Sequence, residues 1–97
     1  MTKRRLPPMK SLIALESVVR IGSVSGAADD LSVTHGAVSK QITLLEQWMG
    51  RPLFSEKRRG MIANPAGERL AAAMGEACRI LATALDAPAA VLQQLGA

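Results

Sequence analysis

The segment Val33-Thr-His-Gly-Ala-Val-Ser-Lys-Gln-Ile-Thr-Leu-Leu-Glu-Gln-Trp-Met49 decides how this chain folds. Its large apolar residues recur at spacings of four, three and four, which places them on one face of a helix; they are Val38, Ile42, Leu45 and Met49. At about 100° per residue, the opposite face carries small and polar residues and a single base; these are Gly36, Ser39, Lys40, Thr43 and Gln47. We therefore expect a helix that packs on the core with one face and can offer the other to a grooved, negatively charged surface.

Local signals mark both ends of this helix and the elements before it. Thr34 is a suitable N-cap, and Gly50 followed by Pro52 ends the helix, so it should span about 34–49. Apolar periodicity predicts an earlier amphipathic helix over 9–21. We expect Ser25 to cap a short helix over 26–31. A short helix, a tight turn and a longer helix with a polar exposed face form a helix-turn-helix.

The second half of the chain predicts a wing and one long helix. Residues 51–63 indicate a two-stranded hairpin with a charged tip, although such short runs give a weak strand signal. Asn64 and Pro65 should start a helix that runs to about residue 86. Gly75 inside it costs roughly 1 kcal/mol relative to Ala, for which close helix approach is one reason. A heptad-like seam follows this helix: Leu70, Met74, Ala77, Leu81 and Leu85.

The seam leaves two interpretations open, a partner helix or folding back on the chain's own domain. The predicted fold class is mainly α: a winged helix-turn-helix of three helices plus a two-stranded wing, followed by a long dimerisation or linker helix. We expect a winged helix-turn-helix domain over residues 1–64, and a linker or dimerisation helix with the C-terminal end over 65–97, without an effector-binding domain.

Composition and charge narrow the function. The chain has 97 residues, a net charge of +4 and a pI of about 10.0. Hydrophobic residues make up 48% but aromatic residues only 2%, which favours an alanine-rich helical core over a sheet sandwich. Five basic residues against one acidic residue lie in 1–20, and four against one in 51–60. Two basic blocks on either side of the central helix indicate either a polyanion-binding surface or a solvated basic surface.

The side chains give little support for an enzyme. The chain has one histidine and one cysteine, Cys78, which excludes an internal disulfide and a four-cysteine zinc site. It has no His/Cys/carboxylate cluster and no phosphate-cradling glycine loop, so we expect no catalysis, no metal and no cofactor. Cys78 is expected to be a small core or interface residue. No apolar run approaches the roughly 20 residues of a membrane span, so we expect a cytoplasmic protein that does not enter a membrane.

The order of these residues resembles a known family. The matching positions are Leu12-x-x-Leu15, Gly22-Ser-Val-Ser-x-Ala-Ala28, Leu31-x-Val-Thr-His-x-Ala-Val-Ser39, Ile42-x-x-Leu-Glu-x-x-Met-Gly-x-Pro-Leu-Phe54 and Asn64-x-x-Gly67. They resemble the N-terminal winged helix-turn-helix of LysR-type transcriptional regulators, in the branch with the glycine-cleavage and β-lactamase activators. The match covers roughly residues 6–86 without a gap.

The resemblance implies a bacterial, nucleoid-associated transcription factor. It implies a homodimer through the C-terminal helix, double-stranded DNA with interrupted dyad symmetry as the partner, and a small-molecule inducer only in a full-length form with an effector domain. This chain departs from the family at Glu56, where an arginine is usual, and Lys57, Arg58 and Arg59 follow it. The phosphate contact of the wing has then moved along the chain, or the wing contributes less.

The candidate DNA-binding residues are those that can enter a groove without bulk or bind a phosphate: Ser25, Thr34, His35, Gly36, Ser39, Lys40, Thr43, Lys57, Arg58 and Arg59. Lys40 suits guanine or a phosphate. Ser25 and Thr34 are also read as helix caps, and His35 as a solvent-exposed residue of the first turn. The basic residues of the wing suit phosphates or the minor groove, or are solvated charges.

Two functions remain open at this point. The first is sequence-specific binding of double-stranded DNA as a dimer, with the helix over about 34–49 in the major groove. The second is a winged-helix module that binds protein, or a short form that hetero-dimerises with a full-length regulator. Steep salt dependence of DNA binding would indicate the first function.

Overall fold

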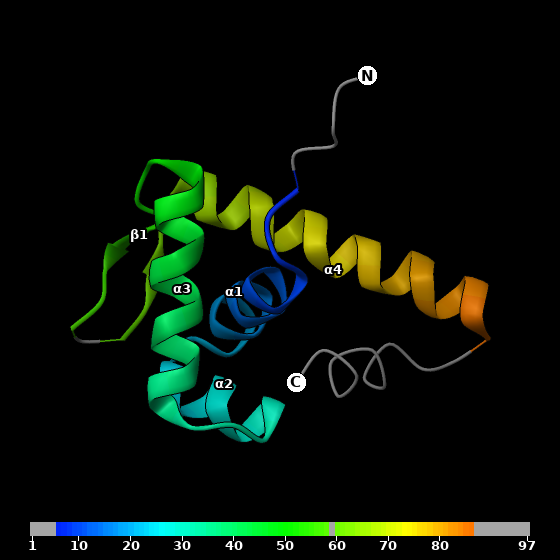
Figure 1. Ribbon diagram of the computed structural model, residues 1–97, viewed down its shortest axis with the longest axis horizontal. Coiled ribbons are helices and arrows are strands. Elements are labelled where there is room, and N and C mark those ends of the chain that lie inside the picture. The colour runs from blue at the N-terminus through cyan, green and yellow to red at the C-terminus, as the bar shows by residue number, and fades with distance from the viewer. Residues whose placement is uncertain (1–5, 59, 87–97) are drawn as a thin grey trace.

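The computed structural model describes residues 6–58 and 60–86, and it has the predicted elements in the predicted order (Figure 1). Three helices come first: α1 over Met9–Ile21, α2 over Val24–Leu31 and α3 over His35–Met49. The strands β1, Phe54–Glu56, and β2, Ile62–Ala63, form the wing, and α4 spans Pro65–Leu85. The mainly helical, winged helix-turn-helix fold class is therefore confirmed.

Helix α1 lies at the centre of the molecule because three other helices pack against it. Figure 1 shows α2, α3 and α4 arranged around α1, and contacts join α1 to each of them. Leu15 and Val18 of α1 are completely buried, as are Leu45 of α3 and Leu53 just before the wing. One core cluster joins all four helices and β1. The core residues therefore fix how α3 and the wing are placed relative to each other.

Most of the predicted helix boundaries are confirmed. Thr34 and Asn64 cap α3 and α4: each side-chain oxygen accepts a hydrogen bond from the backbone N–H three residues later, at 3.0 and 2.9 Å. Gly22 and Gly50 end α1 and α3 with φ of 92° and 72°, a conformation that glycine adopts without strain.

The prediction that Ser25 caps α2 is wrong. The N-cap is Ser23, whose backbone is extended and whose Oγ accepts from the Gly26 N–H at 2.9 Å. Helix α2 therefore begins at Val24 rather than at residue 26, and Ser25 lies inside its first turn. The connection from α1 is so tight that the cap directly follows Gly22, the residue that ends α1.

The wing is a short antiparallel hairpin. Phe54 pairs with Ala63 and Glu56 with Ile62, so the register shifts between the two pairs. Phe54 is buried in the core cluster, which anchors the base of the hairpin. The Leu53 carbonyl accepts from the Asn64 N–H at 3.0 Å, so the end of the wing and the start of α4 are held together.

The buried face of helix α4 consists mostly of small residues and includes only one residue of the predicted seam, Met74. Its buried face consists of Gly67, Ala71, Met74, Cys78 and Ala82. Of the seam residues, Met74 is buried in a cluster with Ile13, Leu31 and Cys78. Leu70 and Ala77 are half-buried, and Leu81 and Leu85 are 43% and 60% exposed. The seam thus divides into a part used by the chain's own core and an exposed part near the end of α4.

The predicted domain boundary between residues 64 and 65 stays a prediction. Helix α4 lies after this boundary, but its Ala71 packs in the main core cluster with the first three helices. Residues 87–97 lie outside the described part of the chain. Cys78 is buried, and this burial, with a smaller effect from the Glu16 charge, raises the pKa of its thiol.

Candidate nucleic-acid interface

The two faces of α3 differ sharply in burial. Val38, Ile42 and Leu45 are buried. The predicted outer face is exposed at every position: Gly36, Ser39, Lys40, Thr43 and Gln47. This face offers hydroxyls, an amide and an ammonium group, and no large apolar side chain. It can hydrogen-bond to base edges and phosphates in a groove that admits one helix.

The start of α3 allows close approach of a ligand to its backbone. A Cβ added to Gly36 would meet only the Thr34 Oγ1, at 3.9 Å. The packing of the chain itself therefore leaves this position open. Thr34 is exposed while it caps the helix, and His35 is exposed in the first turn. The described structure thus places all three residues where a groove-bound ligand can reach them.

Two carboxylates organise the wing, and residue spacing did not indicate either role. Glu56 Oε1 accepts from the backbone N–H groups of Lys57 and Arg58, at 2.9 and 3.2 Å, and so holds the turn of the wing. Glu46 of α3 accepts from the Leu53 N–H at 2.8 Å with one oxygen and from the Lys57 Nζ at 2.5 Å with the other. Glu46 therefore ties α3 to the wing, and such a contact between distant elements leaves no signal in the spacing of residues.

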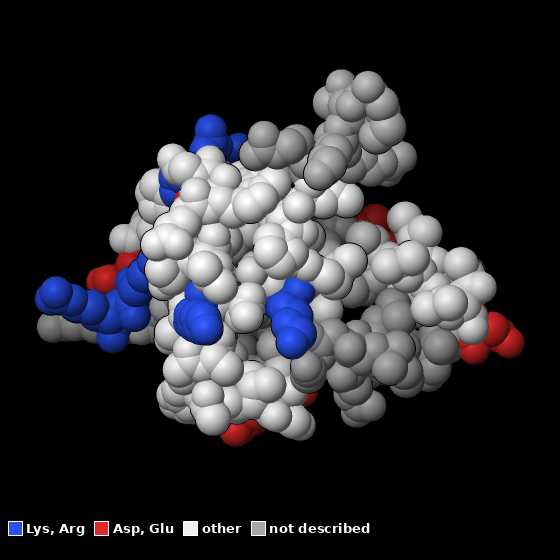
Figure 2. All heavy atoms as spheres, viewed as in Figure 1, with Lys and Arg blue, Asp and Glu red and all other residues white. Residues whose placement is uncertain are grey.

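Basic side chains gather on the face formed by α3, the start of α1 and the wing (Figure 2). The exposed basic residues of these elements and of the segment that joins α3 to β1 are Lys10, Lys40, Arg51, Lys57 and Arg58. Arg59 was a further candidate, but it lies outside the described residues. Lys10 was not among the predicted contacts, although it lies beside Ala37 and Gln41 of α3.

Two carboxylates engage Arg20, so this basic residue is not counted among the candidate contacts. Arg20 is bound to Glu16 at 2.9 Å and to Asp30 at 2.8 Å, and hydrogen bonding to Glu16 raises the pKa of Arg20. Asp30 also accepts from Ser17 Oγ at 2.8 Å. This network joins α1 to α2 and stabilises the helix-turn-helix. Within residues 6–58 and 60–86, neither Lys40 nor Arg58 forms an ion pair, so their charges are available to a polyanion.

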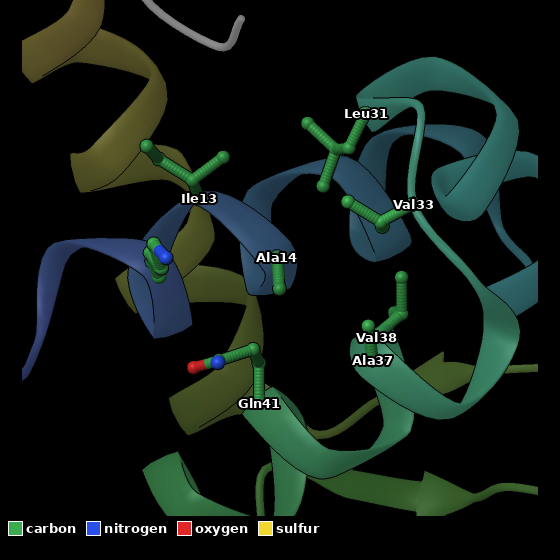
Figure 3. Close-up of a pocket in the computed structure, with 8 residues that line it drawn as sticks. Ile13, Ala14, Leu31, Val33, Ala37, Val38 and Gln41 are labelled. Atoms are coloured by element: carbon green, nitrogen blue, oxygen red, sulfur yellow. The ribbon is translucent and has the colours of Figure 1, made fainter. Parts of the chain in front are cut away.

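Two hollows flank α3. An apolar pocket of about 120 Å³ lies between α1, the turn after α2 and the start of α3 (Figure 3). It is smaller than the roughly 300 Å³ of a typical small-molecule site. On the other side, a hollow of about 140 Å³ lies between α3 and the wing. The described residues hold no cluster of three or more metal-ligating side chains. None of the described helices has the length and apolar character to cross a bilayer.

This geometry defines a winged helix-turn-helix with an exposed polar recognition helix and a basic wing. The family of bacterial regulatory helix-turn-helix proteins, lysR family, matches residues 9–68. This chain belongs to that family and corresponds to the helix-turn-helix DNA-binding domain of LysR-type transcriptional regulators.

Individual relatives agree with this assignment. The HTH-type transcriptional regulator TrpI of Pseudomonas aeruginosa is 46% identical over 74 residues, which are 76% of this chain and 25% of TrpI. The glycine cleavage system transcriptional activator homolog of Haemophilus influenzae is 46% identical over 65 residues, 67% of this chain and 22% of that protein. The chain thus spans about a quarter of the length of these curated relatives.

A solved structure shares the fold. The crystal structure of the CbnR DBD–DNA complex superposes with a TM-score of 0.72 at 22% identity, covering 80% of this chain and 90% of that one. At this identity, the likeness concerns the fold alone. The predicted resemblance to LysR-type regulators, including glycine-cleavage activators, is confirmed by the family match and the relatives together.

Proposed function

We propose that this chain binds double-stranded DNA sequence-specifically as a homodimer, with α3 in the major groove. The observation that carries the proposal is the outer face of α3, which is exposed along its length and has Lys40 at its middle. Lys40 supplies donors for base edges, Ser39 and Thr43 supply hydroxyls on the same face, and Gly36 lets the backbone approach. Thr34, His35 and Ser25 lie at or near the starts of α3 and α2, where they reach phosphates.

The wing supplies further electrostatic contacts. Arg58 is exposed, and the hydrogen bond from its backbone N–H to Glu56 fixes where its side chain leaves the turn. Glu56 therefore orders the wing although it is acidic, and the cationic contact passes to Arg58. Arg58 suits a phosphate or the minor groove next to the groove that α3 occupies.

The dimer contact is assigned to the exposed part of α4. Ile80, Leu81 and Leu85 are 60%, 43% and 60% exposed on its last two turns. Two such helices would bury these side chains against each other in a coiled-coil-like contact. A two-fold dimer places two recognition helices one helical turn of DNA, or a multiple, apart. The expected site is an interrupted dyad.

A full-length form would add an inducer-binding part to this DNA-binding domain. Because the relatives are about four times as long as their matched parts, we assign inducer binding to an effector domain of a full-length form. The chain acts without catalysis, and its DNA target places it at the bacterial nucleoid in the cytoplasm. The exposed leucines of α4 also favour a second function, hetero-dimerisation with a full-length regulator or binding to another protein.

Selection of bound sequences from a random duplex pool tests this proposal. Wild type and the variants Lys40→Ala and Leu81→Glu are compared in parallel. Wild type should enrich an interrupted palindrome, and Lys40→Ala should lose that enrichment while its thermal unfolding stays unchanged. Leu81→Glu should enrich single half-sites at most. If Lys40→Ala enriches the same palindrome, Lys40 does not read bases. If Leu81→Glu alone changes which sequences are enriched and Lys40→Ala behaves as wild type, the protein-binding alternative is favoured.

A further inference from the structure

The hollow between α3 and the wing combines an apolar floor with a polar rim. Val24, Ile42 and Met61 come from α2, α3 and the segment before β2, and they supply the apolar surface. Ser39, Thr43 and Lys57 line the same hollow and supply two hydroxyls and an ammonium group. At about 140 Å³ it is too small and too open to enclose a cofactor. Its chemistry suits a ligand with one apolar part and one anionic part.

Lys57 is already held at the edge of this hollow. Its Nζ lies 2.5 Å from Glu46 Oε1, while the other oxygen of Glu46 accepts from the Leu53 N–H. The Glu46 side chain is only 14% exposed, whereas that of Lys57 is 46% exposed. An ammonium group has three N–H donors, and Glu46 uses one of them. Two donors of Lys57 therefore remain for a ligand, and the anchored Glu46 keeps the ammonium in place.

We propose that this hollow seats one sugar–phosphate unit of the DNA strand that separates the two grooves. The inference rests on the proposed function. When α3 occupies the major groove and the wing meets the neighbouring minor groove, the strand between these grooves has to cross between α3 and the wing. There, a deoxyribose packs on Val24 and Met61, above the buried Ile42. The phosphate oxygens accept hydrogen bonds from Ser39, Thr43 and Lys57.

Glu46 is then a positioning residue for the phosphate contact. It does not face the DNA itself, because one oxygen is bound to the backbone of Leu53 and the side chain is largely buried. It holds Lys57 over the seat before DNA arrives, so less side-chain entropy is lost on binding. This explains why an acidic residue lies beside a basic binding surface.

Single-phosphate neutralisation tests the seat. A set of duplexes has the sequence enriched by wild type, and in each duplex a neutral methylphosphonate replaces one phosphate at a different position. Dissociation constants are measured for wild type, Lys57→Met and the matched control Lys10→Met. For wild type, one position per half-site, between the bases read by α3 and the minor groove met by the wing, should weaken binding about fivefold. Lys57→Met should bind unmodified DNA about fivefold more weakly, and at that position alone its sensitivity should fall to about twofold, which Ser39 and Thr43 still supply. Lys10→Met should keep this sensitivity.

The possible results separate the two proposals. If Lys57→Met is as sensitive as wild type at every position, there is no seat, while sequence-specific binding stands. If wild type binds no duplex specifically, both proposals fail.

The positioning role of Glu46 is tested by Glu46→Gln, whose amide oxygen can still accept from the Leu53 N–H. Its melting temperature should match that of wild type, while sensitivity at the seat falls from about fivefold to about twofold. Full sensitivity in Glu46→Gln would overturn the positioning role.

Discussion

Gly67 in the first turn of α4 is the position where the smallest substitution should do most damage. A Cβ at this residue would lie 2.1 Å from the Leu53 carbonyl oxygen, 3.1 Å from the Leu53 carbonyl carbon and 3.3 Å from the Ala63 Cβ. Leu53 is completely buried, and its carbonyl also accepts from the Asn64 N–H. The obstacle is backbone at the base of the wing, so a rotamer change cannot relieve the clash.

The cost follows from two opposing effects. Replacing glycine by alanine inside a helix gains up to about 1 kcal/mol. Overpacking of a tight core costs typically about 1–3 kcal/mol, occasionally more, and a backbone clash at 2.1 Å belongs at the upper end. We expect Gly67→Ala to lower the free energy of unfolding by about 2 kcal/mol. For a domain of this size, that lowers the melting temperature by about 8–16 °C.

Gly75→Ala in the same helix is the matched control. Its added Cβ would meet only the Glu16 side chain, at 3.9–4.0 Å, which is ordinary contact. We expect Gly75→Ala to stabilise the chain by about 0.5–1 kcal/mol. Urea unfolding followed by circular dichroism measures both variants. Equal stability of Gly67→Ala and Gly75→Ala would refute this account of the packing between the wing and α4.

Three further outcomes are expected. Ser23→Ala should lower the free energy of unfolding by about 1 kcal/mol, because α2 loses its N-cap. Ser25→Ala should change this free energy by less than about 0.5 kcal/mol. Urea midpoints compare the two variants, and a larger loss in Ser25→Ala would restore Ser25 as the cap. Lys40→Ala should make the fall of log K with log salt less steep by up to about 0.9 per protomer in DNA titrations, because a lysine in the groove neutralises phosphate charge; an unchanged slope shows that Lys40 neutralises no phosphate. The raised pKa of the Cys78 thiol leaves less thiolate below that pKa, so native protein at pH 8 should react with a thiol reagent more slowly than protein in urea, and the difference should shrink as pH rises.

Features that depend on nearby residues could be predicted from the sequence. The apolar face of α3 and the caps at Thr34 and Asn64 follow from spacings of three or four residues, so they do not depend on the tertiary fold. Gly22 and Gly50 mark helix ends for the same reason. The exposed face of the recognition helix follows in turn, because it is the side of α3 opposite the apolar residues.

Features that depend on contacts between elements could not be predicted. The ion pair from Glu46 to Lys57 joins α3 to the wing, and the short-range patterns that locate helices say nothing about it. Glu56 looked like a loss of charge from the wing, but the structure shows it holding the turn. Ser23 and Ser25 have the same chemistry, and only the geometry of the tight connection decides between them.

The seam of α4 illustrates a second limit. The spacing of the seam indicated Leu81 and Leu85 for a partner helix, and it gave no sign that Gly67 and Ala71 of the same helix are buried. In an alanine-rich core, small residues allow two helices to approach closely, so size alone does not identify the buried face. Gly75 was also expected to permit close approach, whereas Gly67 makes the tight contact.

The separation of the two faces of α3 has a consequence for how such regulators change over time. The buried face, with Val38, Ile42 and Leu45, carries the stability of the helix-turn-helix. The exposed face, with Lys40 and Thr43, shares none of these residues, and surface substitutions of this kind usually change stability by within about 0.5 kcal/mol. On the proposed function, point changes along this strip of α3 would change the DNA sequence that the chain binds without disturbing its fold.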